Sequence, residues 1–211
     1  MKAFWSRLWA CTACLGGLAA ASQNLAAEDI GLIGSKLSVV QTTNDLFVFF
    51  NFAPIGEEKL PEGAQVTSFK PTGDAFRALV TLGVTTDDRG IITKLDLAVA
   101  RSFIDDPKKC IYAADLVKSF LVSAAVTSDG DDVGALAHEI SARSLSRSTA
   151  TILTAQPLPQ VPVNPSAAYQ TYAGDPQPQT LVYQSGKLQV VLKNETQSKD
   201  PVLDLSVTAT P

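Results

Sequence analysis

Residues 76–101 read FRALVTLGVTTDDRGIITKLDLAVAR and contain the clearest structural signal in the chain. Apolar residues alternate with polar or small ones over 76–84, and the alternation resumes over 91–99 after a polar interruption. A period of two is that of a β-strand with one buried face. Gly90 ends the interruption and can adopt the positive φ that a tight connection requires. The pattern predicts a long β-hairpin over 75–103. The residues expected on its buried face are Phe76, Ala78, Val80, Leu82, Val84, Ile91, Leu95, Leu97 and Val99. Those expected on its wetter face, or near its end, include Lys94, Asp96 and Arg101.

The segment before the hairpin also suggests strands. Residues 36–53 read KLSVVQTTNDLFVFFNFA, which we interpret as two extended segments around Thr43-Asn44-Asp45. The second segment, Leu46 to Phe52, holds four Phe that would occupy both faces of a strand, as in a central strand covered on two sides. Residues 54–63 predict a polar loop, and residues 64–70 a short strand.

Two helices are expected after the hairpin. Asp106 suits an N-cap and Pro107 the first helical position, and apolar residues then recur at helical spacing over 106–125. A second helix is expected over 132–147. Cys110 lies on the apolar stripe of the first helix, which favours a small buried residue with an inert thiol. An intermolecular disulfide or a redox role is the alternative for Cys110.

The C-terminal part changes character twice. Six Pro residues fall within 155–179, which is typical of an extended linker or of a strap over the domain. Tyr169 and Tyr172 favour the strap, because a free linker has little use for aromatic residues. Residues 180–211 predict a β-meander that either extends the preceding sheet or forms a small separate β unit.

The expected fold class is therefore α+β, because runs of strands are followed by helices without alternating βαβ units. We expect an antiparallel β-sheet with two helices packed on one face within residues 28–154. The Pro-rich strap and the C-terminal β-meander follow this domain.

Residues 1–27 have the order of a secretory signal peptide. Two basic residues come first, the apolar or small run 8–21 follows, and small residues precede a cleavage site after Ala27 or, as a second candidate, after Ala21. A retained membrane anchor is an alternative, although the run is shorter than the ~20 residues that a spanning helix needs. Lipidation at Cys11 is a further alternative. The expected location is the periplasm or the outside of the cell.

Composition excludes several protein classes. Removing residues 1–27 leaves 184 of the 211 residues and, with two of the 17 basic residues gone, a net charge of −6. An acidic chain of this kind argues against nucleic-acid binding, and the single long apolar run argues against a polytopic membrane protein. Cys110 would then be the only cysteine, so an internal disulfide is impossible.

Linear motifs for catalysis fail. His138 is the only His, and His138-Glu139 begins like a zinc-protease motif, but Ala142 stands where the second His would be. No Ser lies in a G-x-S-x-G elbow. We therefore interpret His138 as a residue at the boundary of an apolar helix face, and we expect Cys110 and His138 not to form a reactive pair.

Candidate ligand and modification sites are weak as well. The run from Asp129 to Asp132 resembles the start of a calcium loop, but Ile140 replaces the bidentate Glu, so a helix cap is the preferred interpretation. Asn194-Glu195-Thr196 fits a glycosylation sequon, which matters only in a eukaryotic secretory pathway. Asp87-Asp88 and Asp105-Asp106 are neighbours at a turn and at a helix start, which gives no support for a glycosidase. We predict no catalytic, cofactor-binding or metal-binding residues and no cofactor.

These observations lead to one main hypothesis and two alternatives. The main hypothesis is an exported, non-enzymatic protein that binds a protein partner or an envelope component, with no nucleic acid as partner and no membrane span after signal removal. The first alternative is a hydrolase-type enzyme whose Asp, Ser or Tyr residues are scattered along the sequence. The second is an envelope protein that binds a small molecule or an ion.

Overall fold

A computed structural model describes residues 31–125, 132–147, 164–174, 180–195 and 199–210. Within them the chain forms helices and one seven-stranded antiparallel sheet, so the expected α+β class is confirmed. The strands are β1 (Phe52–Lys59), β2 (Gln65–Pro71), β3 (Val80–Thr86), β4 (Ile92–Ala100), β5 (Thr180–Ser185), β6 (Leu188–Glu195) and β7 (Val202–Ala209). The helices are α1 (Leu37–Thr43), α2 (Asp45–Phe49), the 3₁₀ turn η1 (Pro61–Gly63), α3 (Asp74–Arg77), α4 (Arg101–Ile104), α5 (Cys110–Ala125), α6 (Asp132–Arg147) and α7 (Ala167–Ala173).

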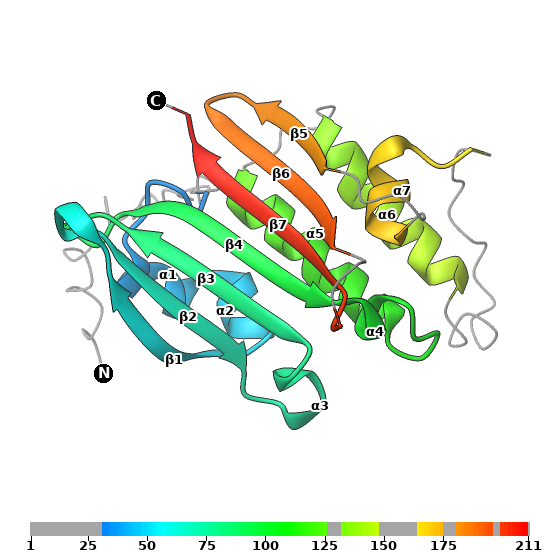
Figure 1. Ribbon diagram of the computed structural model, residues 1–211, viewed down its shortest axis with the longest axis horizontal. Coiled ribbons are helices and arrows are strands. Elements are labelled where there is room, and N and C mark those ends of the chain that lie inside the picture. The colour runs from blue at the N-terminus through cyan, green and yellow to red at the C-terminus, as the bar shows by residue number, and fades with distance from the viewer. Residues whose placement is uncertain (1–30, 126–131, 148–163, 175–179, 196–198, 211) are drawn as a thin grey trace, which may run out of the picture.

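The strands lie in the order β1-β2-β3-β4-β7-β6-β5. The strands that come late in the chain therefore belong to the same sheet as those that come early, and the pairing of β4 with β7 joins the two groups. Helices α1, α2, α5 and α6 lie behind the sheet in Figure 1, and the face toward the viewer carries no helix. We call this second side the open face.

The hairpin that the sequence predicts is present as β3 and β4. Val80 pairs with Val99, Leu82 with Leu97 and Val84 with Leu95. These apolar side chains are at most 2% exposed and lie on the helix-covered side of the sheet, together with Leu203, Leu205 and Val207 of β7. Gly90 has the expected positive φ of 77°. Alternation along the strands thus places the core between the sheet and the helices.

The ends of the predicted hairpin differ from the expectation. Phe76 and Arg101 lie in the short helices α3 and α4 rather than in strands. The ladder also shifts by one residue near Thr86, so that Ile92 is buried in place of Ile91. A bulge of this kind moves every following side chain to the other face.

The largest correction concerns residues 36–53, where two helices replace the predicted extended segments over 37–49, while Phe52 and Ala53 begin β1. The side chain of Asn44 accepts a hydrogen bond from the backbone N–H of Leu46 at 2.9 Å, which caps α2. Leu46 and Phe47 are buried, and the Phe47 ring lies 5.3 Å from that of Phe69 in β2. Phe49 is 77% exposed. The Phe run therefore supplies one buried helix side rather than both faces of a strand.

The predicted loop over 54–63 is also wrong, because most of it forms the edge strand β1. A register shift between Pro54 and Gly56 interrupts its pairing with β2. Edge strands and bulges tolerate proline, since its missing N–H faces no partner there. This explains how a Pro-containing polar segment can still be a strand.

The two long helices match the sequence more closely. Helix α6 has the expected bounds. Helix α5 begins at Cys110, after a turn in which the Asp106 carboxylate accepts the N–H of Lys108 at 2.8 Å, as expected for a cap beside Pro107. Helices α5 and α6 pack against each other, and the backbone carbonyl of Ser144 lies 3.7 Å from the Cys110 sulfur.

Helix α7 lies within the predicted Pro-rich segment, so the extended conformation expected there is wrong for its residues. Tyr169 and Tyr172 are 7% and 0% exposed and face the core. At the N-terminus, Ser166 caps the helix and bonds to the Glu139 carboxylate of α6. At the C-terminus, the Arg101 guanidinium donates to the last carbonyls of the helix. Glu139 thus places a negative charge at the N-terminus of α7, and Arg101 places a positive charge at its C-terminus. The helix dipole favours this arrangement of charges.

Candidate functional site

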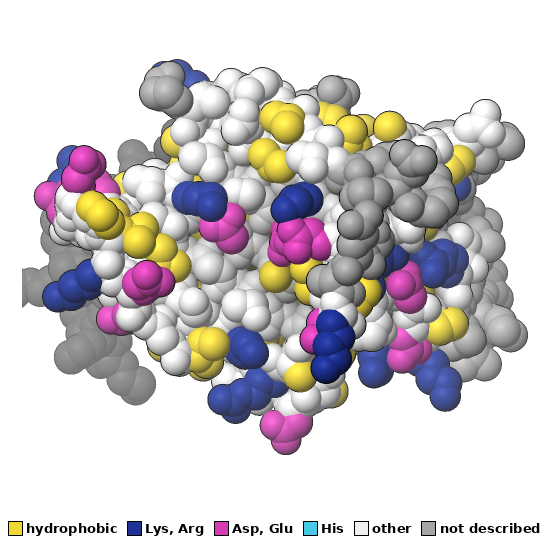
Figure 2. Space-filling model, viewed as in Figure 1, with side chains coloured by type: hydrophobic (Ala, Val, Ile, Leu, Met, Phe, Trp, Pro, Cys, Tyr) yellow, Lys and Arg dark blue, Asp and Glu magenta, His cyan; other side chains and the backbone are white. Residues whose placement is uncertain are grey.

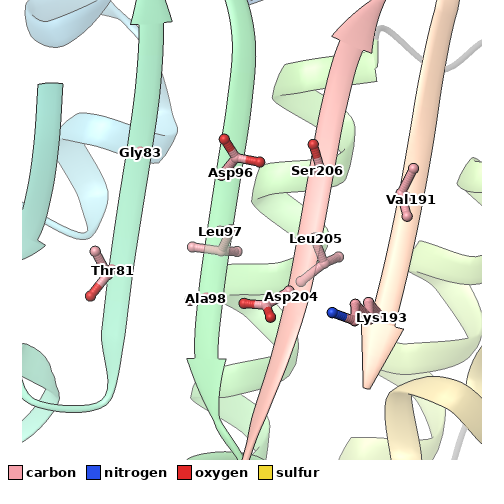
Figure 3. Close-up of a pocket in the computed structure, with 10 residues that line it drawn as sticks. All are labelled: Thr81, Gly83, Asp96, Leu97, Ala98, Val191, Lys193, Asp204, Leu205 and Ser206. Carbon is pink, nitrogen blue, oxygen red and sulfur yellow. The ribbon is translucent and has the colours of Figure 1, made fainter. Parts of the chain in front are cut away.

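The open face of the sheet holds a shallow hollow of about 390 Å³. Figure 3 shows that it crosses strands β3, β4, β7 and β6 at the middle of the sheet. The residues that line it are Thr81, Gly83, Asp96, Leu97, Ala98, Val191, Lys193, Asp204, Leu205 and Ser206. Because both groups of strands contribute, the site exists only once β4 and β7 have paired.

Small residues create the hollow. Gly83 lies opposite Asp96, and Ala98 lies opposite Asp204, so neighbouring strands carry little side-chain volume there. A Cβ added at Gly83 would meet the Asp96 Cβ at 3.6 Å, which is ordinary van der Waals contact. The backbone therefore tolerates a side chain at Gly83, and the absence of one leaves space open to solvent.

Charged side chains surround this space. Figure 2 shows Lys or Arg side chains next to Asp or Glu side chains on the open face. The Lys94 ammonium lies 2.9 Å from the Asp96 carboxylate, and Lys193 forms an ion pair with Glu195. Both pairs lie along single strands, at positions two residues apart that share one face.

Asp204 is the exception among these charges. Within the described residues no hydrogen bond or ion pair joins its carboxylate to another group, although Lys193 is its register partner on β6. Partial burial raises the pKa of Asp204, the carboxylates of Glu195 and Asp96 raise it further, and Lys193 lowers it. The hollow therefore contains one carboxylate whose charge no paired cation balances.

The described side chains of the hollow supply groups that can bind a ligand. Within the described ranges no group of three or more His, Cys, Asp or Glu side chains is placed to hold a metal ion. The hydroxyl-bearing residues of the hollow, Thr81 and Ser206, have no imidazole beside them, because His138 lies on α6. The chemistry on offer is hydrogen bonding, apolar contact and a negative charge.

The residues that the sequence analysis weighed lie elsewhere. Cys110 is 1% exposed, as expected for a buried residue, and burial raises the pKa of its thiol. His138 is exposed on α6, while its neighbour Glu139 is buried and bonded to Arg143 at 2.7 Å. His138 and Cys110 are on different helices, and neither lines the hollow.

Asp87 and Asp105 of the two carboxylate pairs have structural roles. Asp87 accepts hydrogen bonds from the backbone of Ile91 and from Arg89, which lowers its pKa. Asp105 pairs with Arg101 at 2.6 Å. Asn194, the asparagine of the sequon, is 1% exposed and so is not presented to solvent in the folded chain. Most of the calcium-like loop lies in residues 126–131, outside the described residues.

Sequence reasoning missed Asp204, Lys193 and Ser206 as site residues. Alternation in β7 puts Asp204 and Ser206 on the face opposite to Leu203, Leu205 and Val207, and in β6 Lys193 points away from the buried Val190 and Leu192. The pairing of β7 between β4 and β6, which brings them beside Asp96, has no local signal.

Comparison with known proteins gives no further guide. No protein-family model, no curated protein and no solved structure matches this chain.

Proposed function

We propose that this chain is an exported, non-enzymatic protein that binds a protein partner or an envelope component through the open face of its sheet. The observation that carries the proposal is the hollow at the centre of that face, with its small floor residues and its unbalanced carboxylate. A one-sided sheet normally presents a simple solvated surface. Here the surface is recessed, and polar and charged side chains converge on the same place, a combination that supports a binding role.

One other observation agrees with the proposal. The segment 1–27 has the pattern of a secretory signal, which supports delivery to the periplasm or to the outside of the cell. None of the described helices is long and apolar enough to cross a membrane. Large apolar side chains are also exposed in the helical layer, among them Phe49 of α2 and Val122 of α5, so the test has to compare the two sides.

Site-specific photo-crosslinking tests the proposal. A photoreactive side chain replaces Val191, which lines the hollow, or Val122, which is 46% exposed on α5 in the helical layer. We expect the Val191 probe to crosslink one discrete partner in the producing cell and the Val122 probe to give none. Equal crosslinking from both positions, or none from Val191, would contradict the proposal.

Intact-mass measurement tests the export part separately. We expect the secreted or periplasmic form to lack residues 1–27, with cleavage after Ala21 as the second candidate. A recovered mass equal to that of the full chain would reject the signal peptide.

A hydrolase is the second candidate function. One observation favours it, namely that Asp204, whose pKa is raised, and Ser206 lie in the same hollow. A panel of ester, amide and glycoside substrates distinguishes the two functions. Turnover that disappears in Asp204→Asn and Ser206→Ala, without any crosslinked partner, would replace the binding proposal with the enzyme.

A further inference from the structure

We propose that the hollow receives a basic side chain of a protein partner, an arginine or a lysine, with Asp204 as its counter-ion. This inference rests on the proposed function and adds the chemistry of the contact. Three arguments support it. The charges around the hollow leave one carboxylate unpaired, the residues at its floor are small or apolar, and acidic or apolar side chains of a partner would fit it less well.

Among the charged side chains around the hollow, the carboxylate of Asp204 has no paired cation. Lys94 is paired with Asp96, and Lys193 is paired with Glu195. Lys94 and Lys193, the lysines of these two pairs, are therefore engaged, and the carboxylate of Asp204 lies between the two pairs, opposite Ala98 on β4. A partner that covered this face would remove water from Asp204, and a carboxylate without water or a cation is strongly disfavoured. Complementarity therefore requires a positive charge from the partner.

The floor of the hollow suits the stem of a basic side chain. Gly83, Ala98 and Val191 offer small or apolar surface beside the carboxylate. Arginine and lysine lay their methylene stems on apolar surface while the charged head reaches a polar group. An arginine head has five donors, so it could reach Asp204 and also the Ser206 hydroxyl or the Asp96 carboxylate, which open onto the same space.

Other occupants fit less well. An acidic side chain would meet the carboxylates of Asp204 and Asp96. An apolar side chain would match the floor but would leave Asp204 buried and uncompensated. The open face therefore discriminates among partners by penalising the wrong charge as well as by attracting the right one.

A pair of peptides tests the inference directly. The probe is an acetylated and amidated seven-residue peptide, Gly-Thr-Val-Arg-Val-Thr-Gly, and its control carries citrulline in place of arginine, which keeps the shape and removes the charge. We expect NMR shifts confined to the open face, at Thr81, Ala98 and Ser206, with the arginine peptide at up to about 10 mM. Citrulline should weaken binding at least about tenfold, as expected for a charge-assisted contact.

Three variants separate the local contact from general electrostatics. Asp204→Asn should weaken binding about tenfold or more. Gly83→Val should abolish it by filling the hollow, since the backbone there admits a side chain. Asp45→Asn removes the same charge from the exposed surface of α2 and should leave binding unchanged. Equal weakening by Asp45→Asn and Asp204→Asn, or no open-face shifts with the arginine peptide, would overturn the inference.

Its failure is distinguishable from failure of the proposed function. If the Val191 probe still crosslinks its partner and Asp204→Asn crosslinks equally well, the open face binds a partner but not through a basic side chain. If the Val191 probe captures nothing, the proposed function itself is wrong.

Discussion

Replacing Gly174 with alanine should destabilise the protein far more than a glycine-to-alanine change ordinarily does. Gly174 ends α7 with a φ of 81°, and a Cβ there would lie 2.7 Å from Nη2 and 2.8 Å from Cζ of Arg101. Arg101 is only 7% exposed. Its guanidinium donates hydrogen bonds to the carbonyls of Tyr172 and Ala173 and pairs with the carboxylate of Asp105. The new methyl group therefore cannot be accommodated unless Arg101 leaves its partners.

The magnitude follows from two contributions. An alanine in the left-handed region costs about 1–2 kcal/mol. Displacing Arg101 costs at least one hydrogen bond from a charged donor to a buried carbonyl, worth about 1.5–3 kcal/mol. We expect Gly174→Ala to lower the free energy of unfolding by about 2.5–5 kcal/mol, the sum of these two contributions. Gly90→Ala is the matched control, because Gly90 has a φ of 77° but no atom within 4 Å of the added Cβ, and it should show the first contribution alone.

Urea unfolding of the two variants and of the wild type measures both values. A double-mutant cycle with Arg101→Ala isolates the clash, since Gly174→Ala should cost only about 1–2 kcal/mol once the guanidinium is gone. If Gly174→Ala and Gly90→Ala cost the same, Arg101 is not held against the end of α7, and our account of how α7 is anchored is wrong.

Three further predictions concern the core, the thiol and pH. Phe47→Ala should lower the free energy of unfolding, measured in urea, by about 3–5 kcal/mol. Phe49→Ala, at a residue that is 77% exposed, should change it by less than about 0.5 kcal/mol. Equal effects of the two substitutions would contradict the helical assignment. Cys110 should react with a thiol reagent only as fast as the protein unfolds, because it is buried and burial raises its pKa; rapid labelling of the native protein would contradict this. Burial and neighbouring carboxylates raise the pKa of Asp204, so the folded state binds its proton more tightly than the unfolded chain. The stability linked to that proton is present below the ordinary pKa of 3.8 and is lost as pH rises through the raised value. Asp204→Asn should therefore raise Tm relative to the wild type at pH 7 more than at pH 3.5, and the reverse order would refute the sign.

Strong local periodicity accounts for what the sequence could predict. The alternation in β3 and β4 and the helical stripe of α6 extend over many residues, so tertiary contacts did not override them. Residues 36–49 lack such a signal. Apolar residues at consecutive positions fit a doubly covered strand and a short helix equally well, and the cap at Asn44 together with the contact between Phe47 and Phe69 decides for the helix.

For the candidate site, the sequence could predict which side chains point outward but not which of them lie together. The outward positions of Lys94 and Asp96 follow from alternation alone. Their meeting with Lys193 and Asp204 depends on β7 inserting between β4 and β6, a pairing of segments about a hundred residues apart in the chain. Register between distant strands is set by the assembled core and not by any short stretch of sequence.

The position of β7 has a consequence for the order in which the chain can fold. The last strand along the described chain is an inner strand of the sheet, and it alone connects β1–β4 to β5 and β6. A chain made or translocated from its N-terminus therefore cannot close the sheet until residues 202–209 arrive, and closing so long a loop is slow. For a protein that we propose to be exported, this arrangement would postpone closure of the sheet until residues 202–209 have passed through the membrane.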